Sequence, residues 1–195
     1  MINSDRYNIE MIQKQLQEDL DDYRYEHTVG VAYTAASLAM CYGYSVETAF
    51  VAGLLHDCAK CMDKDEREEY CKENHIQLTV YEFENPSLQH AKIGSYLCET
   101  KYHVNDENIK NAIASHTTGR PDMSLLEKII FIADYIEPNR MVLPRIDLIR
   151  KMAFTNINYA VKLILNDTIN HLKKSGKTMD PMTEETYKFY KNNDF

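Results

Sequence analysis

The chain has 195 residues, 44% of them hydrophobic, and a formal net charge of −8. This length allows a single domain with a sizeable core, and the acidic balance argues against a nucleic-acid duplex as partner, because phosphate neutralisation needs a basic face. Glycine (6) and proline (5) are sparse, and helical periodicity extends over nearly the whole sequence. We therefore predict an all-α fold, a helical bundle in one domain over residues 1–195.

The same features predict a cytoplasmic protein that does not span a membrane. Residues 1–22 carry charges throughout, unlike a signal peptide. The longest uncharged run, residues 28–46, contains several tyrosines and polar residues and is typical of a buried helix followed by a turn. The five cysteines are an odd number without regular pairing, which indicates reduced thiols.

Capping residues and apolar periodicity divide the chain into helices. The first is expected to begin at Ser4, and Gly43 ends the second. Ser124 followed by Glu127 has the pattern of a capping box. The other expected helices cover residues 23–41, 45–59, 63–74, 87–102, 106–115, 128–137 and 156–174, followed by a tail loop over 176–181 and a last short helix.

Residues 54–60 close the nearly uncharged helix predicted over 45–59, and they contain the pair His56 and Asp57. Adjacent helical residues point about 100° apart, so both side chains reach one site only if it lies off the helix end. Buried imidazole and carboxylate groups need partners, and a metal ion held between them would satisfy both. For this pair alone, a core histidine capped by its neighbour is the alternative.

Asp134 interrupts the apolar run 129–136 in a similar way. An unpaired buried carboxylate is so unfavourable that it must meet a cation, either a metal ion or a guanidinium from Arg140 or Arg145. Three histidines lie in polar segments and are expected to face solvent: His75, His103 and His171. The candidates for a shared metal site come from five predicted helices and are His27, His56, Asp57, His90, His116 and Asp134.

Imidazole and carboxylate ligands without thiolate suit iron, manganese or zinc. Six side chains are many for one catalytic ion that must keep an open position. If Asp57 bridges two octahedral ions, positions stay free for a bridging water and for substrate oxygens. Such a site is typical of two-metal hydrolysis at a phosphoryl group.

The order of these residues, with Lys60 in the pattern His-Asp-x-x-Lys, resembles the HD-domain superfamily of metal-dependent phosphohydrolases. Segments 24–31, 53–60, 114–119 and 133–140 are similar to the bacterial YqeK family of symmetrical diadenosine-tetraphosphate (Ap4A) hydrolases. The resemblance covers about residues 23–181. It implies an HD-domain helical bundle with a buried dinuclear metal site, a core over about residues 23–174, and a tail over 176–195 that packs near the nucleotide.

The resemblance also implies an activity, the cleavage of Ap4A into two ADP by a metal-bridging hydroxide, and a homodimer. The six candidates would hold two divalent ions, iron first, with manganese or zinc as alternatives. Asp57 and Lys60 would be catalytic. The tail lacks the histidine expected directly before Pro181. The residues implied in substrate binding are Arg24, Lys60, Thr117, Arg140, Lys177, Thr178, Met179, Asp180 and Pro181.

Other functions stay open at this point. The same scaffold serves hydrolases of nucleoside monophosphates, nucleoside triphosphates and cyclic dinucleotides, and it can serve as a nucleotide sensor without turnover. A structural zinc site is a further alternative, because Cys58-x-x-Cys61 followed by Cys71 and His75 resembles a zinc-finger spacing.

Three of the four cationic candidates have alternatives of their own. Lys60 can be a solvated lysine at a helix end, which the helix dipole favours. The other two can form surface ion pairs, Arg140 with Glu137 and Arg24 with Asp21.

Overall fold

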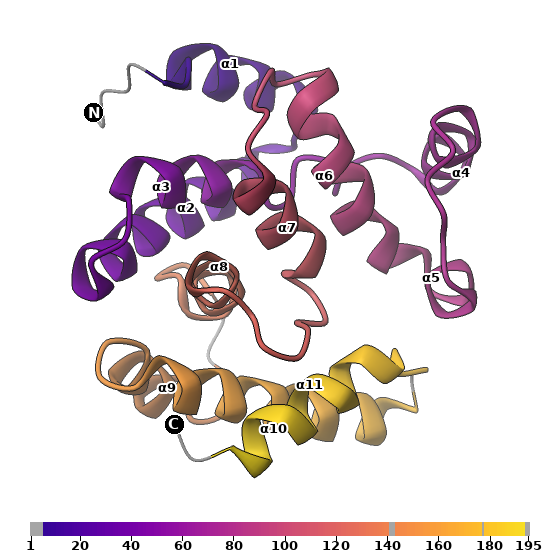
Figure 1. Cartoon of the computed structure of the whole chain (residues 1–195). Coiled ribbons are helices and arrows are strands. Elements are labelled where there is room, and N and C mark those ends of the chain that lie inside the picture. Colours follow the sequence, from indigo (N-terminus) through magenta and orange to yellow (C-terminus); the bar gives the residue numbers. More distant parts are fainter. Residues whose placement is uncertain (1–5, 141–142, 177, 194–195) are drawn as a thin grey trace.

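The computed structural model describes residues 6–140, 143–176 and 178–193, and it confirms the all-α prediction (Figure 1). No strand is present among these residues. The elements are α1 (Ile9–Asp19), α2 (Asp22–Tyr42), α3 (Val46–Leu55), α4 (Lys64–Glu73), α5 (Val80–Glu84), the 3₁₀ helix η1 (Pro86–Leu88), α6 (Gln89–Thr100), α7 (Glu107–Ser115), α8 (Leu125–Ile136), α9 (Ile146–Ala153), α10 (Ile157–Ser175) and α11 (Pro181–Asn192).

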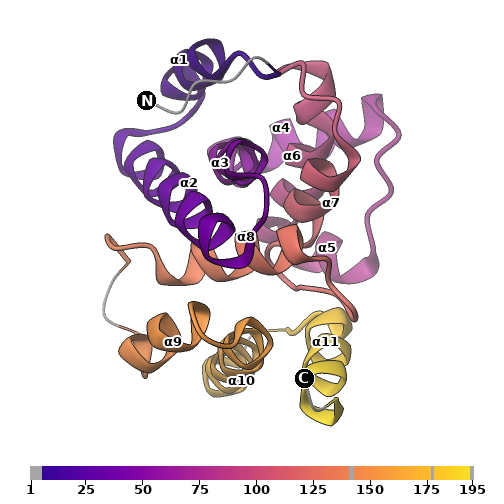
Figure 2. The same ribbon diagram turned by 60° about the vertical axis from the view of Figure 1, so that its left-hand side comes forward.

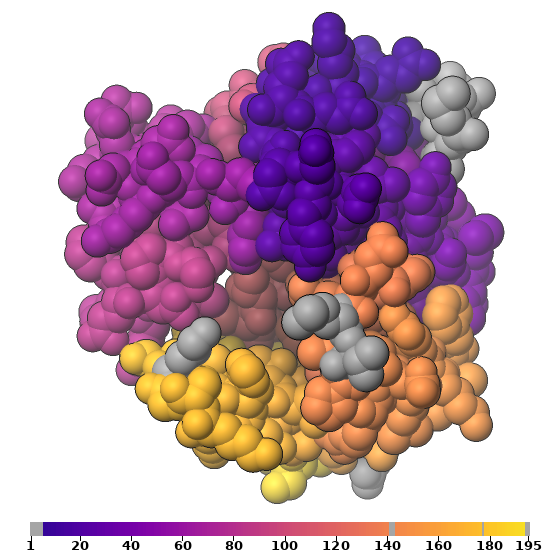
Figure 3. Space-filling view, turned by 180° about the vertical axis from the view of Figure 1, so that it is seen from behind, coloured from indigo at the N-terminus to yellow at the C-terminus, as the bar shows by residue number. Residues whose placement is uncertain are grey.

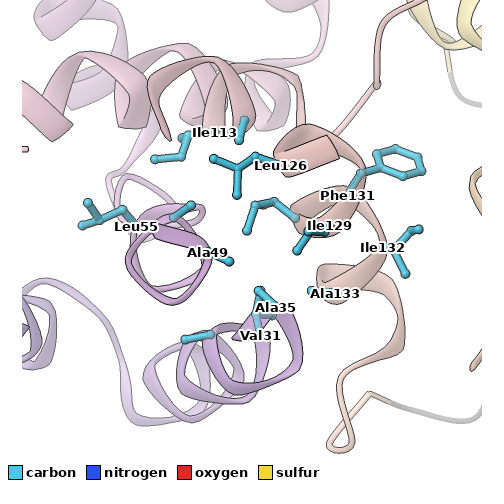
Figure 4. Packing of buried hydrophobic residues seen from close by; sticks show 14 of the residues in the cluster. Val31, Ala35, Ala49, Leu55, Ile113, Leu126, Ile129, Phe131, Ile132 and Ala133 are labelled. Atoms are coloured by element: carbon cyan, nitrogen blue, oxygen red, sulfur yellow. The ribbon is translucent and has the colours of Figure 1, made fainter. Parts of the chain in front are cut away.

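Helix α8 lies at the centre of the bundle, with α2, α3 and α7 on one side and α9 and α10 on the other (Figure 2). Its sequence is apolar nearly all round because neighbours cover both sides. Leu126 lies beside Ile113 of α7 and Ala133 beside Ala35 of α2, whereas Phe131 and Ile132 lie on the opposite side (Figure 4). A polar side chain on α8 therefore has little solvent to reach.

Helices α2 and α3 cross at very short distance because Gly53 has no side chain. A Cβ atom at this position would lie 2.6 Å from the Cα of Ala32, closer than real Cβ contacts allow. Any larger residue at position 53 would push the two helices apart. The close crossing brings the residues directly after α3 against the face of α2 that carries His27.

Most predicted helix ends agree with the structure, but two helices are shorter than expected. Helix α1 begins at Ile9 with Asn8 as its N-cap, whereas the predicted start, Ser4, lies outside the described residues. The helix predicted over 45–59 ends at Leu55, and the chain continues as a series of turns. In a continued helix the adjacent side chains of His56 and Asp57 would point about 100° apart. The helix ends early because both must reach the same buried site.

The short helices α5 and α9 were not predicted. Helix α5 has only five residues, too few for periodicity to be visible, and it is stabilised by a capping box between Thr79 and Glu82. Helix α9 follows Arg145, which adopts a left-handed conformation with φ of 59°. The predicted capping box between Ser124 and Glu127 is confirmed, with both hydrogen bonds present.

Two further predictions are confirmed. The histidines assigned to solvent, His75, His103 and His171, are exposed. All five cysteines are free. In the part of the chain that the structure describes, no helix combines the length and apolar character needed to cross a membrane.

Asp106 ties the N-terminal segment to the bundle. Its carboxylate caps α7 by accepting from the N–H groups of Asn108 and Ile109, and it accepts a 2.9 Å hydrogen bond from the hydroxyl of Tyr7. Burial acts to raise the pKa of Asp106, but these hydrogen bonds and the nearby Arg6 hold it below the ordinary value. The ionised carboxylate therefore stabilises the folded state.

We predict that Asp106→Ala lowers the free energy of unfolding by about 1–2 kcal/mol near pH 7, as expected for a lost helix cap. Because the folded-state pKa is depressed, this contribution is complete above the unfolded pKa of about 4 and is lost as the pH falls below it. Urea unfolding of both proteins from pH 7 to pH 3.5 measures the difference. A difference in the free energy of unfolding that stays constant or increases toward acid pH contradicts the role given to the ionised carboxylate of Asp106.

Candidate metal centre

Two groups of three side chains can each hold a metal ion, and they share Asp57. The first group contains His27 and His56, and the second contains His90 and His116. Within each group the ligand atoms lie within 4.8 Å of one another, and all five residues are buried. A carboxylate shared in this way is positioned to bridge two ions, the arrangement of two-metal sites.

Asp134 lies against the first group. Its Oδ1 is 3.1 Å from Nε2 of His27 and 3.8 Å from Nε2 of His56. The same oxygen accepts a 3.0 Å hydrogen bond from Arg140, so of the two arginines that the sequence left open as partners, Arg140 is the one in contact. Arg145 pairs with Asp167 instead.

Three of the four histidines lie at helix ends, where their rings bond to the backbone. His56 directly follows α3, His116 directly follows α7, and His90 is the second residue of α6. In each, Nδ1 donates to the carbonyl oxygen three residues earlier, over 2.7 Å to Gly53, 2.7 Å to Ile113 and 2.5 Å to Ser87. A carbonyl oxygen only accepts, so Nδ1 carries the proton and Nε2 keeps its lone pair.

His27 is the exception, because it lies inside α2. Its Nδ1 is 3.1 Å from Oε1 of Glu137, and its Nε2 faces Asp134. Glu137 is only 1% exposed, so it is not the surface partner of Arg140 that the sequence left open. Sequence reasoning missed its contact with His27; the available signal was a carboxylate directly after an apolar helix that the fold must bury.

The centre of the cluster contains buried polar atoms that make no hydrogen bond to any described residue. Among the described residues, neither Nε2 of His56 nor Oδ1 of Asp57 takes part in a hydrogen bond. Nε2 of His90 lies 3.1 Å from Nε2 of His116, and both nitrogens carry lone pairs if each Nδ1 is protonated. Unpaired buried atoms and facing lone pairs are unfavourable, and a divalent cation between them would make both arrangements attractive. The residues therefore fit a metal site.

The protonation equilibria favour the same assignment. Burial lowers the pKa of His56 and of His90 to about 4, so both rings are neutral at pH 7, as ligands must be. Burial acts to raise the pKa of Asp57, but the surrounding histidines hold it well below the ordinary value. Burial also acts to lower the pKa of His27, yet the carboxylates of Asp134 and Glu137 raise it overall.

Three cationic side chains connect this cluster with solvent. Arg24 donates a 2.7 Å hydrogen bond to Oδ2 of Asp57, and Nζ of Lys60 lies 3.9 Å from Oδ1 of the same residue. Burial lowers the pKa of Lys60. The side chains of Arg24, Lys60 and Arg140 are 21%, 31% and 31% exposed, against 4% for Asp57, so they form the rim of the site.

A recess opens beside the cluster, where α2, the α4–α6 side of the molecule and the α10–α11 side meet (Figure 3). One cavity of about 410 Å³ is lined by His116, Asp134 and Arg140 together with apolar and aromatic side chains. A second, of about 530 Å³, contains Thr178 and Asp180 from the tail loop. Both cavities are lined by Thr117 and Thr168, so they adjoin.

Not every predicted substrate residue lines these cavities. Met179 and Pro181 belong to the same segment as Thr178 and Asp180 but are not among the lining residues. Asp180, which stands where a histidine was expected, caps α11 through the N–H of Met182. Lys177 lies outside the described residues.

The cysteines form no alternative metal site. Cys58 and Cys71 are buried, whereas Cys61 and His75 are exposed. Within the described residues, the groups able to hold an ion contain only the histidines and Asp57. The zinc-finger interpretation is therefore not supported.

Comparison with known proteins agrees with this geometry, since the HD domain family matches residues 24–139. This chain belongs to the HD domain family. A protein of Halalkalibacterium halodurans named symmetrical bis(5′-nucleosyl)-tetraphosphatase is 43% identical over 86% of this chain and 89% of its own. A Bacillus subtilis protein of the same name is 40% identical over 88% of this chain and 91% of its own.

The HD domain fold is also found in a solved structure. The crystal structure of a predicted HD superfamily hydrolase from Clostridium acetobutylicum, described as involved in NAD metabolism, superposes with a TM-score of 0.90. It is 38% identical, and the match covers 94% of this chain and 97% of that one. The arrangement of helices that brings the histidines together is therefore that of a known HD hydrolase.

We predict that Mn²⁺ raises the melting temperature of the metal-free protein. Binding at 100-fold excess over Kd stabilises by about 2.7 kcal/mol per site, which for a chain of this size is about 5–10 °C. His56→Ala, which removes a candidate ligand nitrogen from the centre, should lose most of the shift, while His103→Ala on the surface should keep it. Differential scanning fluorimetry measures both; equal shifts in the two variants contradict the site.

Proposed function

We propose that this protein hydrolyses diadenosine tetraphosphate symmetrically to two ADP. The observation that carries the proposal is Asp57, shared by two groups that can each hold a cation and bordered by Arg24 and Lys60. Relatives that are 40% and 43% identical over most of the chain bear the name of this activity. A site with two cations beside a cationic rim suits a polyanionic phosphate chain.

We propose His27, His56, Asp57, His90, His116 and Asp134 as the ligands of two divalent ions. The neutral imidazoles of His56 and His90 and the ionised carboxylate of Asp57 support this assignment. So do Nε2 of His56 and Oδ1 of Asp57, which have no hydrogen-bond partner among the described residues. Nitrogen and oxygen ligands without thiolate suit iron, manganese or zinc, and the family resemblance puts iron first. When bound, the ions would supply an activated water and positive charge near the phosphoryl oxygens.

The rim cations have a separate task in this proposal. Arg24 and Arg140 now pair with Asp57 and Asp134, and their guanidinium groups would exchange these carboxylates for phosphate oxygens when substrate enters. Lys60 carries its ammonium 3.3 Å from a ring nitrogen of His90, at the wall of the same site. Positive charge held here would oppose the negative charge that develops on the phosphoryl oxygens, which is the largest expected catalytic contribution.

The two adjoining cavities would accept the two nucleosides. Their volumes of about 410 and 530 Å³ lie within the range of small-molecule sites, and Thr117 borders both. We propose Thr117, Thr178 and Asp180 as contacts to the substrate, supported by their position in the lining. Lys177, Met179 and Pro181 stay predictions from the family resemblance, as do a homodimer and a cytoplasmic location.

We predict that the purified protein, loaded with metal, converts Ap4A to ADP alone. Liquid chromatography of the products distinguishes this from asymmetric cleavage, which gives AMP and ATP. Asp57→Ala should abolish turnover because it removes the shared ligand of both groups, while helical circular dichroism persists. Turnover of a nucleoside monophosphate or of a pyridine dinucleotide in preference to Ap4A would favour a different substrate for the same centre, in keeping with the solved relative.

We predict that Lys60→Ala lowers kcat for Ap4A on the order of 10²-fold, the usual effect of losing one electrostatic donor in an active site. Lys64→Ala is the matched control, because this nearby lysine is 64% exposed and pairs only with Glu68 among the described residues. Steady-state kinetics of both variants measures the difference. Equal kcat values in the two variants would contradict a catalytic role and favour the alternative, in which Lys60 is a solvated lysine at a helix end.

A further inference from the structure

Glu137 is a buried carboxylate that the proposed reaction does not use. It directly follows α8, and its side chain is 1% exposed. Oε1 lies 3.1 Å from Nδ1 of His27, and Oε2 accepts a 2.7 Å hydrogen bond from the N–H of Asn139. Arg150 fixes the backbone of the same residue by donating to its carbonyl oxygen over 3.2 Å. Both carboxylate oxygens and the main chain are therefore held.

The position of His27 explains why such a partner is needed. The other three histidines lie at helix ends and bond their Nδ1 atoms to backbone carbonyl oxygens. His27 is the sixth residue of α2, where the carbonyl oxygens of the helix interior accept from the backbone N–H groups of the following turn. A ring at this position needs a side-chain acceptor to hold its Nδ1 proton, and Glu137 is that acceptor.

The surface of α2 has space for the carboxylate of Glu137 because residue 30 is a glycine. Gly30 lies one turn after His27 on α2, and a Cβ atom there would stand 2.6 Å from Oε2 of Glu137. Glycine inside a helix lowers its stability relative to alanine, so the position has a cost. The space that Gly30 leaves lets Glu137 reach His27 across the backbone of α2.

From this geometry we infer that Glu137 is a positioning residue for the metal centre: it fixes His27 in the tautomer with Nδ1 protonated and Nε2 free to bind an ion, and Gly30 provides its space. The inference rests on the proposed function only in taking His27 as a ligand. Partners of this kind hold the ring orientation of metal-bound histidines, and their loss weakens metal binding about 10–100-fold.

Glu137→Gln makes the sharpest test, because an amide has one acceptor oxygen and one donor nitrogen. With its oxygen kept on the N–H of Asn139, the amide NH₂ would face Nδ1 of His27. The ring should then carry its proton on Nε2, toward Asp134, and lose the lone pair that binds an ion. ¹⁵N NMR of the metal-free protein, recorded above the raised pKa of His27 so that the ring is neutral, distinguishes the two tautomers of His27 without any activity measurement.

Calorimetric titration of the metal-free protein with Mn²⁺ gives the second readout. We expect Glu137→Gln to bind at least one Mn²⁺ 10–100-fold more weakly than wild type. Asp106→Asn is the matched control, a buried carboxylate that also accepts backbone N–H groups but touches none of the candidate ligands, and it should bind like wild type. If Glu137→Gln does not fold, Gly30→Ala takes its place, since it leaves the carboxylate in the chain but displaces it.

A double-mutant cycle completes the test. Gly30→Ala should weaken Mn²⁺ binding in the wild-type background and add little to Glu137→Ala, because the clash partner is then gone. Wild-type affinity and an unchanged His27 tautomer in Glu137→Gln, or equal effects of Gly30→Ala in both backgrounds, overturn the inference while leaving the metal centre intact. A wild-type protein that binds neither Mn²⁺ nor Fe²⁺ nor Zn²⁺ overturns both the inference and the proposed function.

Discussion

The structure depends on one electrostatic constraint, the gathering of four imidazole rings around the carboxylate of Asp57. Each ring is tied through Nδ1 to an oxygen behind it, so each presents Nε2 to the centre. Lone pairs and carboxylate oxygens that face one another in a buried space are unfavourable without a cation. Close crossing of α2 and α3 at Gly53 and the early end of α3 at Leu55 both serve to bring these groups together.

An acidic protein can bind a polyanion if its positive charge is concentrated where the substrate lies. Here the net charge is −8, yet three cationic side chains form the rim of the cluster. The charges of these side chains nearly cancel, because Asp57 and Asp134 pair with Arg24 and Arg140. Two divalent ions would make the same region strongly positive, which provides the local field that the overall charge does not.

The sequence predicted the fold well where residues act locally. The capping box at Ser124 and the start of the helix predicted at residue 106 depend on hydrogen bonds between near neighbours in the chain, and both are present. The predicted end of the helix at residue 59 was wrong, because the helix ends at Leu55. His56 and Asp57 reach one common centre only if they lie outside the helix. Helix α5 was not predicted because five residues are too few to show the periodicity of apolar residues that marks a helix.

For the site, the sequence indicated which side chains come together but not what holds them. The six candidates lie in five distant segments, and a buried charge or imidazole is itself a signal that a partner exists. For Glu137 the only signal was its position directly after an apolar helix, where a carboxylate is usually solvated. Its burial against Gly30 depends on how α8 crosses α2. Contacts across helices of this kind cannot be read from periodicity.

The central claim is that two cations share Asp57, and elemental analysis of the purified protein tests it most directly. Protein prepared without oxygen and freed of excess metal should contain two ions per chain. His27→Ala and His116→Ala should each lose one ion, from different groups, whereas Asp57→Ala should lose both. One ion or none in the wild type, or an Asp57→Ala protein that keeps two, would contradict the account.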